Sequence, residues 1–100
     1  GGSLGIADLP ADEAVSTALG ILSRFLAMHR GRSALVTTAK LRRVAGRMLR
    51  KATDASALIS ILLSSGVVVD GRGRAWRLVS AERRSGNGRE RWRLMYARIG

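Results

Sequence analysis

The chain has 100 residues, 46% of them hydrophobic, and it contains no cysteine. These features fit one domain with a single modest core, and they exclude disulfides, a thiolate nucleophile and a cysteine-bound metal. They also exclude a spanning helix, because no apolar run is long enough to cross a bilayer. We expect residues 1–7 to be a vector-derived remnant or a disordered N-terminus, and residues 8–100 to form the single domain.

The charge of the chain is strongly basic and unevenly distributed. The 18 Lys and Arg residues outnumber the 7 Asp and Glu residues, which gives a formal net charge of +11. Residues 1–22 hold three acidic and no basic side chains, and residues 23–100 hold all the basic ones. So dense an excess attracts a polyanion; the alternative is a basic face that only aids solubility. The scarcity of amide side chains and the excess of Arg over Lys fit a thermophile source or a GC-rich genome.

The first predicted element is a helix over residues 11–29. Pro10 suits the entry into a helix, and the carboxylates of Asp12 and Glu13 complement its positive end. Gly31 is a stop signal after the last turn. Apolar residues recur at helical spacing and predict one buried face: Val15, Ala18, Leu19, Leu22, Phe25 and Leu26.

A short strand over residues 33–36 and a second helix over residues 39–50 are predicted next. Thr37 or Thr38 can cap this helix with its hydroxyl. Gly46 weakens it by about 1 kcal/mol relative to Ala. Its expected apolar stripe consists of Leu41, Val44, Ala45 and Met48.

A third helix is predicted over residues 55–65, capped by Thr53 or Asp54 and ended by Gly66. Apolar side chains cover more than half of its circumference. The remaining polar stripe is narrow, because its serines repeat at intervals of four residues: Ser56, Ser60 and Ser64.

The rest of the chain is predicted to be β, with strands over residues 67–69, 74–84 and 89–98. A four-residue loop over residues 85–88 is favoured between the last two strands, because it sets Arg83 against Glu90, Glu82 against Arg91 and Val79 against Leu94. A two-residue loop at Asn87 and Gly88 is the alternative, and its register offers a single ion pair, between Glu82 and Arg93.

This order of elements resembles that of the winged helix-turn-helix superfamily over residues 11–79. Residues 35–41 (LVTTAKL) look like the family's entry into its second helix, and residues 58–68 (LISILLSSGVV) like its third helix running into a strand. The resemblance implies an α+β fold of three helices and a small antiparallel sheet, here with an extra C-terminal hairpin. It also implies DNA binding, with the third helix in the major groove.

The third helix departs from the family in its polar residues. It has no Arg, Lys, Asn or Gln, the side chains that form bidentate contacts with guanine and adenine. Ser56 and Ser60 can donate to phosphates but discriminate poorly between bases. We therefore expect nucleic-acid binding with weak sequence specificity.

The best candidate contact surface is the basic side of the second helix and the connector after it. Helical spacing places guanidinium groups about 5–6 Å apart, and Arg binds phosphate oxygens bidentately. No carboxylate occurs in residues 23–53 to neutralise them, although a solvated helix face is the alternative interpretation. The residues are Arg42, Arg43, Arg47, Arg50 and Lys51.

The two predicted hairpins carry further basic residues. Arg72 and Arg74 lie around the first turn and could enter a minor groove, although an ordinary exposed hairpin explains them nearly as well. The second hairpin forms an accessory basic arm, from which we select Arg84 and Arg89 as contacts; the whole set is Arg83, Arg84, Arg89, Arg91 and Arg93.

The aromatic residues allow two interpretations. Trp76, Trp92 and Tyr96 could stack on unpaired bases, but core packing is favoured because the chain holds only four aromatic residues. His29 stands near a helix end, where contact with the terminal carbonyls is favoured over metal binding.

These features predict a binding protein rather than an enzyme, with no cofactor and no metal. There is no second His, no useful carboxylate pair and no phosphate-loop motif. We expect binding to duplex DNA in a chromatin-type or regulatory role, in a prokaryotic cytoplasm at the nucleoid, with no membrane partner. The alternatives are an RNA-binding module of a ribonucleoprotein and a protein-interaction domain that forms a homodimer.

Overall fold

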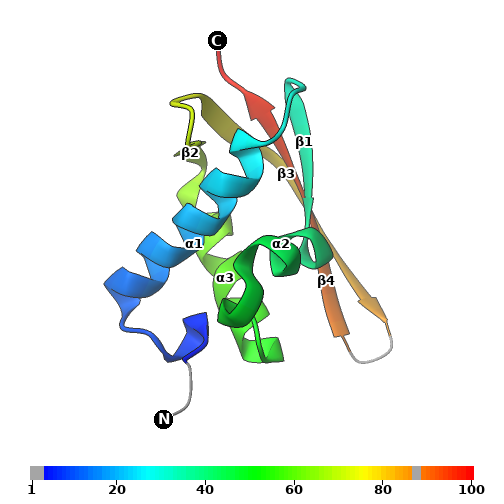
Figure 1. The fold of residues 1–100 in the computed structure, drawn as a ribbon. Coiled ribbons are helices and arrows are strands. Elements are labelled where there is room, and N and C mark those ends of the chain that lie inside the picture. Colours follow the sequence, from blue (N-terminus) through cyan, green and yellow to red (C-terminus); the bar gives the residue numbers. More distant parts are fainter. Residues whose placement is uncertain (1–3, 87–88) are drawn as a thin grey trace.

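The computed structural model describes residues 4–86 and 89–100 and shows an α+β fold (Figure 1). Three helices lie on one face of a four-stranded antiparallel sheet with the strand order β1-β4-β3-β2. The elements in chain order are η1 (Ile6–Asp8), α1 (Ala11–Ala27), β1 (Ser33–Thr37), α2 (Thr38–Ala45), η2 (Gly46–Met48), α3 (Ala52–Ser65), β2 (Val67–Val69), β3 (Ala75–Gly86) and β4 (Arg89–Arg98), where η denotes a short 3-10 helix.

The core lies between the helices and the sheet. Burial alternates along β1, where Ala34 and Val36 are buried and their neighbours are not. The largest buried side chains, Trp76 and Tyr96, come from the sheet face that the helices cover. Three apolar residues of α3 complete this core: Leu58, Ile59 and Leu62. Most of the apolar side chains of α3 therefore pack in the core.

The folded part of the chain begins earlier than residue 8, the boundary predicted from the sequence. Ile6 is fully buried in the core, and the backbone N–H of Ala7 donates to the carboxylate of Asp54 at 2.9 Å. A Cβ on Gly5 would overlap the same carboxylate. The η1 segment is thus packed against α3, because its apolar side chain and its amide both find partners there.

The predicted caps are partly confirmed. The Thr37 hydroxyl accepts the backbone N–H of Lys40 at 3.2 Å and caps α2. The predicted cap of α3 is wrong, because the helix begins at Ala52 and Lys51 is its cap residue. Asp54 lies one turn inside, where its carboxylate accepts the backbone N–H groups of Arg50 and Lys51, each at 2.9 Å.

Two helix ends differ from the prediction. α1 ends at Ala27 rather than at residue 29. α2 ends at Ala45 rather than at residue 50, because Gly46 adopts a φ of 57° and a ψ of −120°. A positive φ leaves the right-handed helical region at little cost for glycine only.

Gly46→Ala should therefore destabilise the protein by about 1–2 kcal/mol, since an L side chain at positive φ is strained. No atom lies within 4 Å of a Cβ built at Gly46, so crowding adds nothing to this cost. Urea unfolding measures the change. The matched control is Gly20→Ala inside α1, where the space is also open and the helix should gain about 0.5–1 kcal/mol. A destabilisation at both positions would contradict the explanation.

The register of the β3–β4 hairpin is the one predicted as the alternative. Arg84 pairs with Arg91 and Glu82 with Arg93, so the favoured four-residue loop is wrong. The loop residues Asn87 and Gly88 themselves lie outside the described residues.

A β-bulge interrupts β3 at Val79. Leu78 pairs with Tyr96, but the next pair joins Ser80 to Met95, so Val79 has no partner in β4. The predicted pairing of Val79 with Leu94 is therefore wrong, and Leu94 pairs with Ala81 instead. A bulge bends its strand and increases the local twist. The hairpin beyond it projects past the core as an arm, and Ala81, Glu82, Arg83 and Arg84 are all exposed.

Candidate nucleic-acid interface

An open groove of about 560 Å³ lies between the start of α2 and the β3–β4 arm. We call it the arginine groove. Its walls carry four arginines, Arg42 of α2, Arg84 of β3 and Arg91 and Arg93 of β4. The remaining lining residues are Thr37, Thr38, Ala39 and Trp92. Side chains that are far apart in the sequence thus share one basic surface.

The groove forms because β4 is longer than its neighbour β1. The last pair between these strands joins Thr37 to Arg93, so the edge of β4 beyond this pair is not covered by β1. The start of α2 lies against that edge, where the hydroxyl of Thr38 accepts the backbone N–H of Trp92 at 3.1 Å. Thr38 is buried by this contact. Arg42 lies one helical turn further along α2 and reaches the same groove.

The charges of the groove are largely unneutralised. In the part of the chain that the structure describes, no carboxylate forms an ion pair with Arg42, Arg91 or Arg93. Arg84 contacts Glu82 at 3.1 Å, but both side chains are exposed, and such pairs contribute little. Arg84 also lies directly opposite Arg91 in the ladder. Like charges at opposed positions are destabilising, and an anion bound between them would relieve that repulsion.

Backbone donors add to this positive surface. The first N–H groups of a helix have no acceptor inside the helix and carry its positive dipole end. Among the described residues none accepts a hydrogen bond from the amides of Thr38 or Ala39. A helix start in a groove lined by four arginines can bind phosphate oxygens.

The other basic residues predicted on the second helix lie outside the lining of the groove. Arg43, Arg47 and Arg50 are exposed on α2, η2 and the connector after them. Lys51 forms an exposed ion pair with Asp8 at 3.4 Å. Of the basic residues predicted on the second helix and the connector, Arg42 thus shares a groove with the arginines of the arm.

The remaining predicted contacts are scattered. Ser56 and Ser60 are exposed on α3. Arg72 is exposed in the β2–β3 turn, at the opposite end of β3 from the arm (Figure 1). It lines a second cavity, of about 590 Å³, together with Arg30 and the end of α1. The Arg89 side chain lies outside the described part of the chain.

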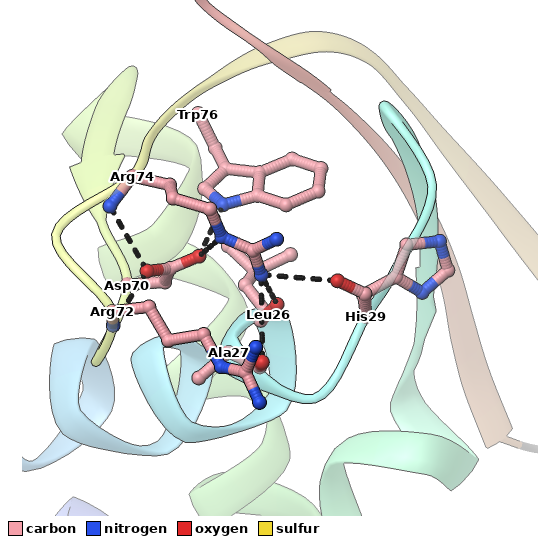
Figure 2. A network of polar contacts seen from close by, with 7 residues as sticks. All are labelled: Leu26, Ala27, His29, Asp70, Arg72, Arg74 and Trp76. Carbon is pink, nitrogen blue, oxygen red and sulfur yellow. Dashed lines mark hydrogen bonds and ion pairs between the residues drawn. The ribbon is translucent and has the colours of Figure 1, made fainter.

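Arg74 has a structural position instead of the predicted place in a wing (Figure 2). Its Nε contacts the Asp70 carboxylate at 2.7 Å. A terminal nitrogen of its guanidinium donates to the carbonyls of Leu26, Ala27 and His29 at 2.9, 3.4 and 3.0 Å. These carbonyls lie in and just after the last turn of α1, where few backbone N–H groups remain to bond them, so Arg74 caps the end of that helix.

The sequence predicted that His29 contacts the terminal carbonyls of α1. Its imidazole lies elsewhere in the structure. It packs edge-on against the Trp76 ring, with centroids 6.1 Å apart. The carbonyl of His29 is instead one of the acceptors of Arg74.

Asp70 is the centre of this network. It is buried, and its carboxylate accepts the indole N–H of Trp76 at 2.8 Å and the backbone N–H groups of Arg72 and Arg74 at 2.7 and 3.0 Å. Burial alone would raise the pKa of Asp70, but the hydrogen bonds from Trp76, Arg74 and Arg72 hold the pKa well below its usual value of 3.8. The carboxylate stays ionised and ties the β2–β3 turn to α1.

The aromatic residues fall into two groups. Trp76 and Tyr96 are fully buried, which confirms core packing for both, and burial raises the pKa of Tyr96 to about 12. Trp92 packs against the core but remains partly exposed and lines the arginine groove. From the sequence, core packing was favoured for Trp92, and Arg91 and Arg93 belonged to the basic arm without being selected as contacts. The signal that could have found them is a tryptophan flanked by two arginines in one strand.

The described residues contain no group of three side chains that could hold a metal ion. None of their helices has the length and apolarity needed to cross a membrane. Comparison with protein-family models, with curated proteins and with solved structures finds no match to this chain.

Proposed function

We propose that this protein binds double-stranded DNA with weak sequence specificity and holds the phosphate backbone in the arginine groove. The observation that supports this function best is the convergence of four arginines from α2, β3 and β4 on one groove, of which Arg42, Arg91 and Arg93 have no carboxylate partner among the described residues. Neutralising phosphates in this way releases counterions and supplies sequence-independent affinity.

We also propose that the fold is a winged helix-turn-helix in which the β3–β4 arm is the wing. Support comes from the order of the elements, a helix and a strand followed by two helices and a hairpin. The arm projects beyond the core, whereas the β2–β3 turn is tied to α1 through Asp70 and Arg74. The exposed polar side chains of α3 are all hydroxyls, which supports weak base readout: Thr53, Ser56, Ser60 and Ser64.

The biological role that fits such binding is a chromatin-associated or transcription-regulatory one, in a prokaryotic cytoplasm at the nucleoid. The protein acts by binding and not by catalysis in this proposal. The burial of Leu58, Ile59 and Leu62 removes the main support for a homodimer formed through α3.

Binding to duplex DNA should weaken steeply with salt. If about four or five phosphates are neutralised, the logarithm of the association constant should fall against the logarithm of salt concentration with a slope of about −4. Fluorescence anisotropy with two unrelated duplexes of equal length, between 50 and 200 mM salt, measures the slope and the sequence preference together. A flat salt dependence, or a strong preference for one duplex, would rule out the proposed mechanism. Competition between duplex DNA and structured RNA tests the alternative that the protein is an RNA-binding module.

A further inference from the structure

We infer that the arginine groove also accepts a nucleotide whose base is unpaired, with the base stacked on Trp92 and the phosphate held by the arginines around it. The inference rests on the proposed nucleic-acid binding and names a preferred form of the ligand, single-stranded DNA or RNA. The observation behind it is the position of Trp92 in the groove wall between Arg91 and Arg93.

Trp92 differs from the other aromatic residues of the chain. Trp76 and Tyr96 are fully buried, and Phe25 packs against the core from α1. The indole N–H of Trp76 is bonded to Asp70, whereas the indole N–H of Trp92 donates to none of the described residues. Of these four side chains, Trp92 alone lines the groove. It has both an accessible surface and a free donor there.

An aromatic side chain cannot stack on the bases of an intact duplex. The bases of a duplex are stacked within the helix, and a groove that contacts phosphates reaches only sugars and phosphate oxygens. An unpaired base instead offers a flat surface to an aromatic ring. Sites for single strands combine such rings with a basic path for the backbone. The arginine groove has this combination, since Trp92 lies among Arg42, Arg84, Arg91 and Arg93.

The size and the donors of the groove fit a single nucleotide. Its volume of about 560 Å³ lies within the range of about 300–1,000 Å³ that is typical of small-ligand sites. The amides of Thr38 and Ala39 at the start of α2 supply backbone donors beside the guanidinium groups. A phosphate at this end of the groove would leave its base near Trp92.

The test compares Trp92→Leu with Trp92→Phe. Affinities for a thymidine oligonucleotide, a uridine oligonucleotide and a duplex of the same length are measured at one salt concentration. Trp92→Leu should weaken binding to the single strands by about 5- to 150-fold, the range for loss of one stacked base. Its affinity for the duplex should fall by a smaller factor, because paired bases cannot stack on the ring. Trp92→Phe keeps an aromatic ring and should retain most of the single-strand affinity. Circular dichroism establishes that both variants fold.

Acrylamide quenching of the wild-type protein provides a readout that needs no variant. Trp76 is shielded in the core, so the quenchable fluorescence reports Trp92. Single strands should protect this fluorescence more strongly than a fully paired duplex does. Equal protection by both ligands, or equal losses of affinity for both in Trp92→Leu, would overturn the inference.

A failure of the stacking inference can be distinguished from a failure of the proposed duplex binding. Trp92-dependent single-strand binding without duplex binding would overturn only the duplex proposal, and salt-dependent duplex binding without a Trp92 effect would overturn only the stacking.

Discussion

Replacing Arg42, Arg91 and Arg93 together by Gln should weaken duplex binding by roughly two to three orders of magnitude at 0.1 M salt. A slope of about 0.9 per phosphate corresponds to about an eightfold loss for each contact at that concentration. The salt slope should become shallower by about 2.7 for the same reason. The three side chains are chosen because none forms an ion pair with a carboxylate among the described residues. Anisotropy titrations across a salt series measure both quantities.

The matched control removes the same charge elsewhere. Arg30 and Arg72 line the second cavity, and Arg77 is exposed on β3; their joint replacement by Gln also lowers the net charge by three. This control should reduce affinity only severalfold, through the weaker general field. Ser56→Ala with Ser60→Ala should also do little, because a hydroxyl bonds phosphate more weakly than a guanidinium. If the two arginine triples weaken binding equally, the groove is not the binding site.

Asp70→Ala should destabilise the fold by about 3–5 kcal/mol, the usual cost of breaking a buried ion pair by removing one partner. The change leaves the Arg74 guanidinium without its carboxylate and the Trp76 indole N–H without its acceptor. Against a total stability of about 5–15 kcal/mol this is a large fraction. Urea and thermal unfolding measure it.

A double-mutant cycle is the control for this network. Combining Asp70→Ala with Arg74→Met removes the unpaired charge and should recover part of the loss, so the double variant should be less destabilised than the sum of the single ones. Strict additivity of the two single changes, or a loss below about 1 kcal/mol for Asp70→Ala, would contradict the assignment of Asp70 as the centre of the network.

The pH dependence of stability follows from the same carboxylates. The pKa of Asp70 is lowered in the folded protein, and so is that of Asp54, where burial raises the pKa but the backbone N–H groups of Lys51, Ala7 and Arg50 lower it further. A lowered pKa contributes stability that is present above the ordinary value of 3.8 and is lost as the pH falls below it toward the folded value. Wild type should therefore lose stability below about pH 4 more steeply than Asp70→Ala.

Local signals in the sequence were enough to predict most of the secondary structure. Thr37 caps α2 as predicted, and the valines before residue 70 form β2. The end of α1 was harder to predict, because its cause is not local. α1 ends where Arg74, more than forty residues away, meets its carbonyls, and no pattern around His29 indicates this partner.

The candidate site was predictable only in part, because it depends on strand register. Opposite charges favoured one register by a few tenths of a kcal/mol. The bulge at Val79 brings Trp76, Leu78 and Tyr96 to one face of the sheet. Burial of a large side chain stabilises the fold by roughly 1.5–3 kcal/mol, which outweighs the charge pairs. Arg91 and Arg93 come to lie near the start of α2 because β1 pairs with β4 up to Arg93. The sequence alone could place Arg42 on a helix but could not show what lies opposite.

Because of the bulge at Val79, the direction of the arm depends on one extra residue in β3. The pairs on either side of it, Leu78 with Tyr96 and Ser80 with Met95, would remain in step if Val79 were lost. A deletion of this one codon would therefore keep every arginine on its present face of the sheet but straighten the strand that carries them. Evolution can in this way change which ligands the arm reaches by altering chain length at a single position, without altering either the charge of the protein or its core.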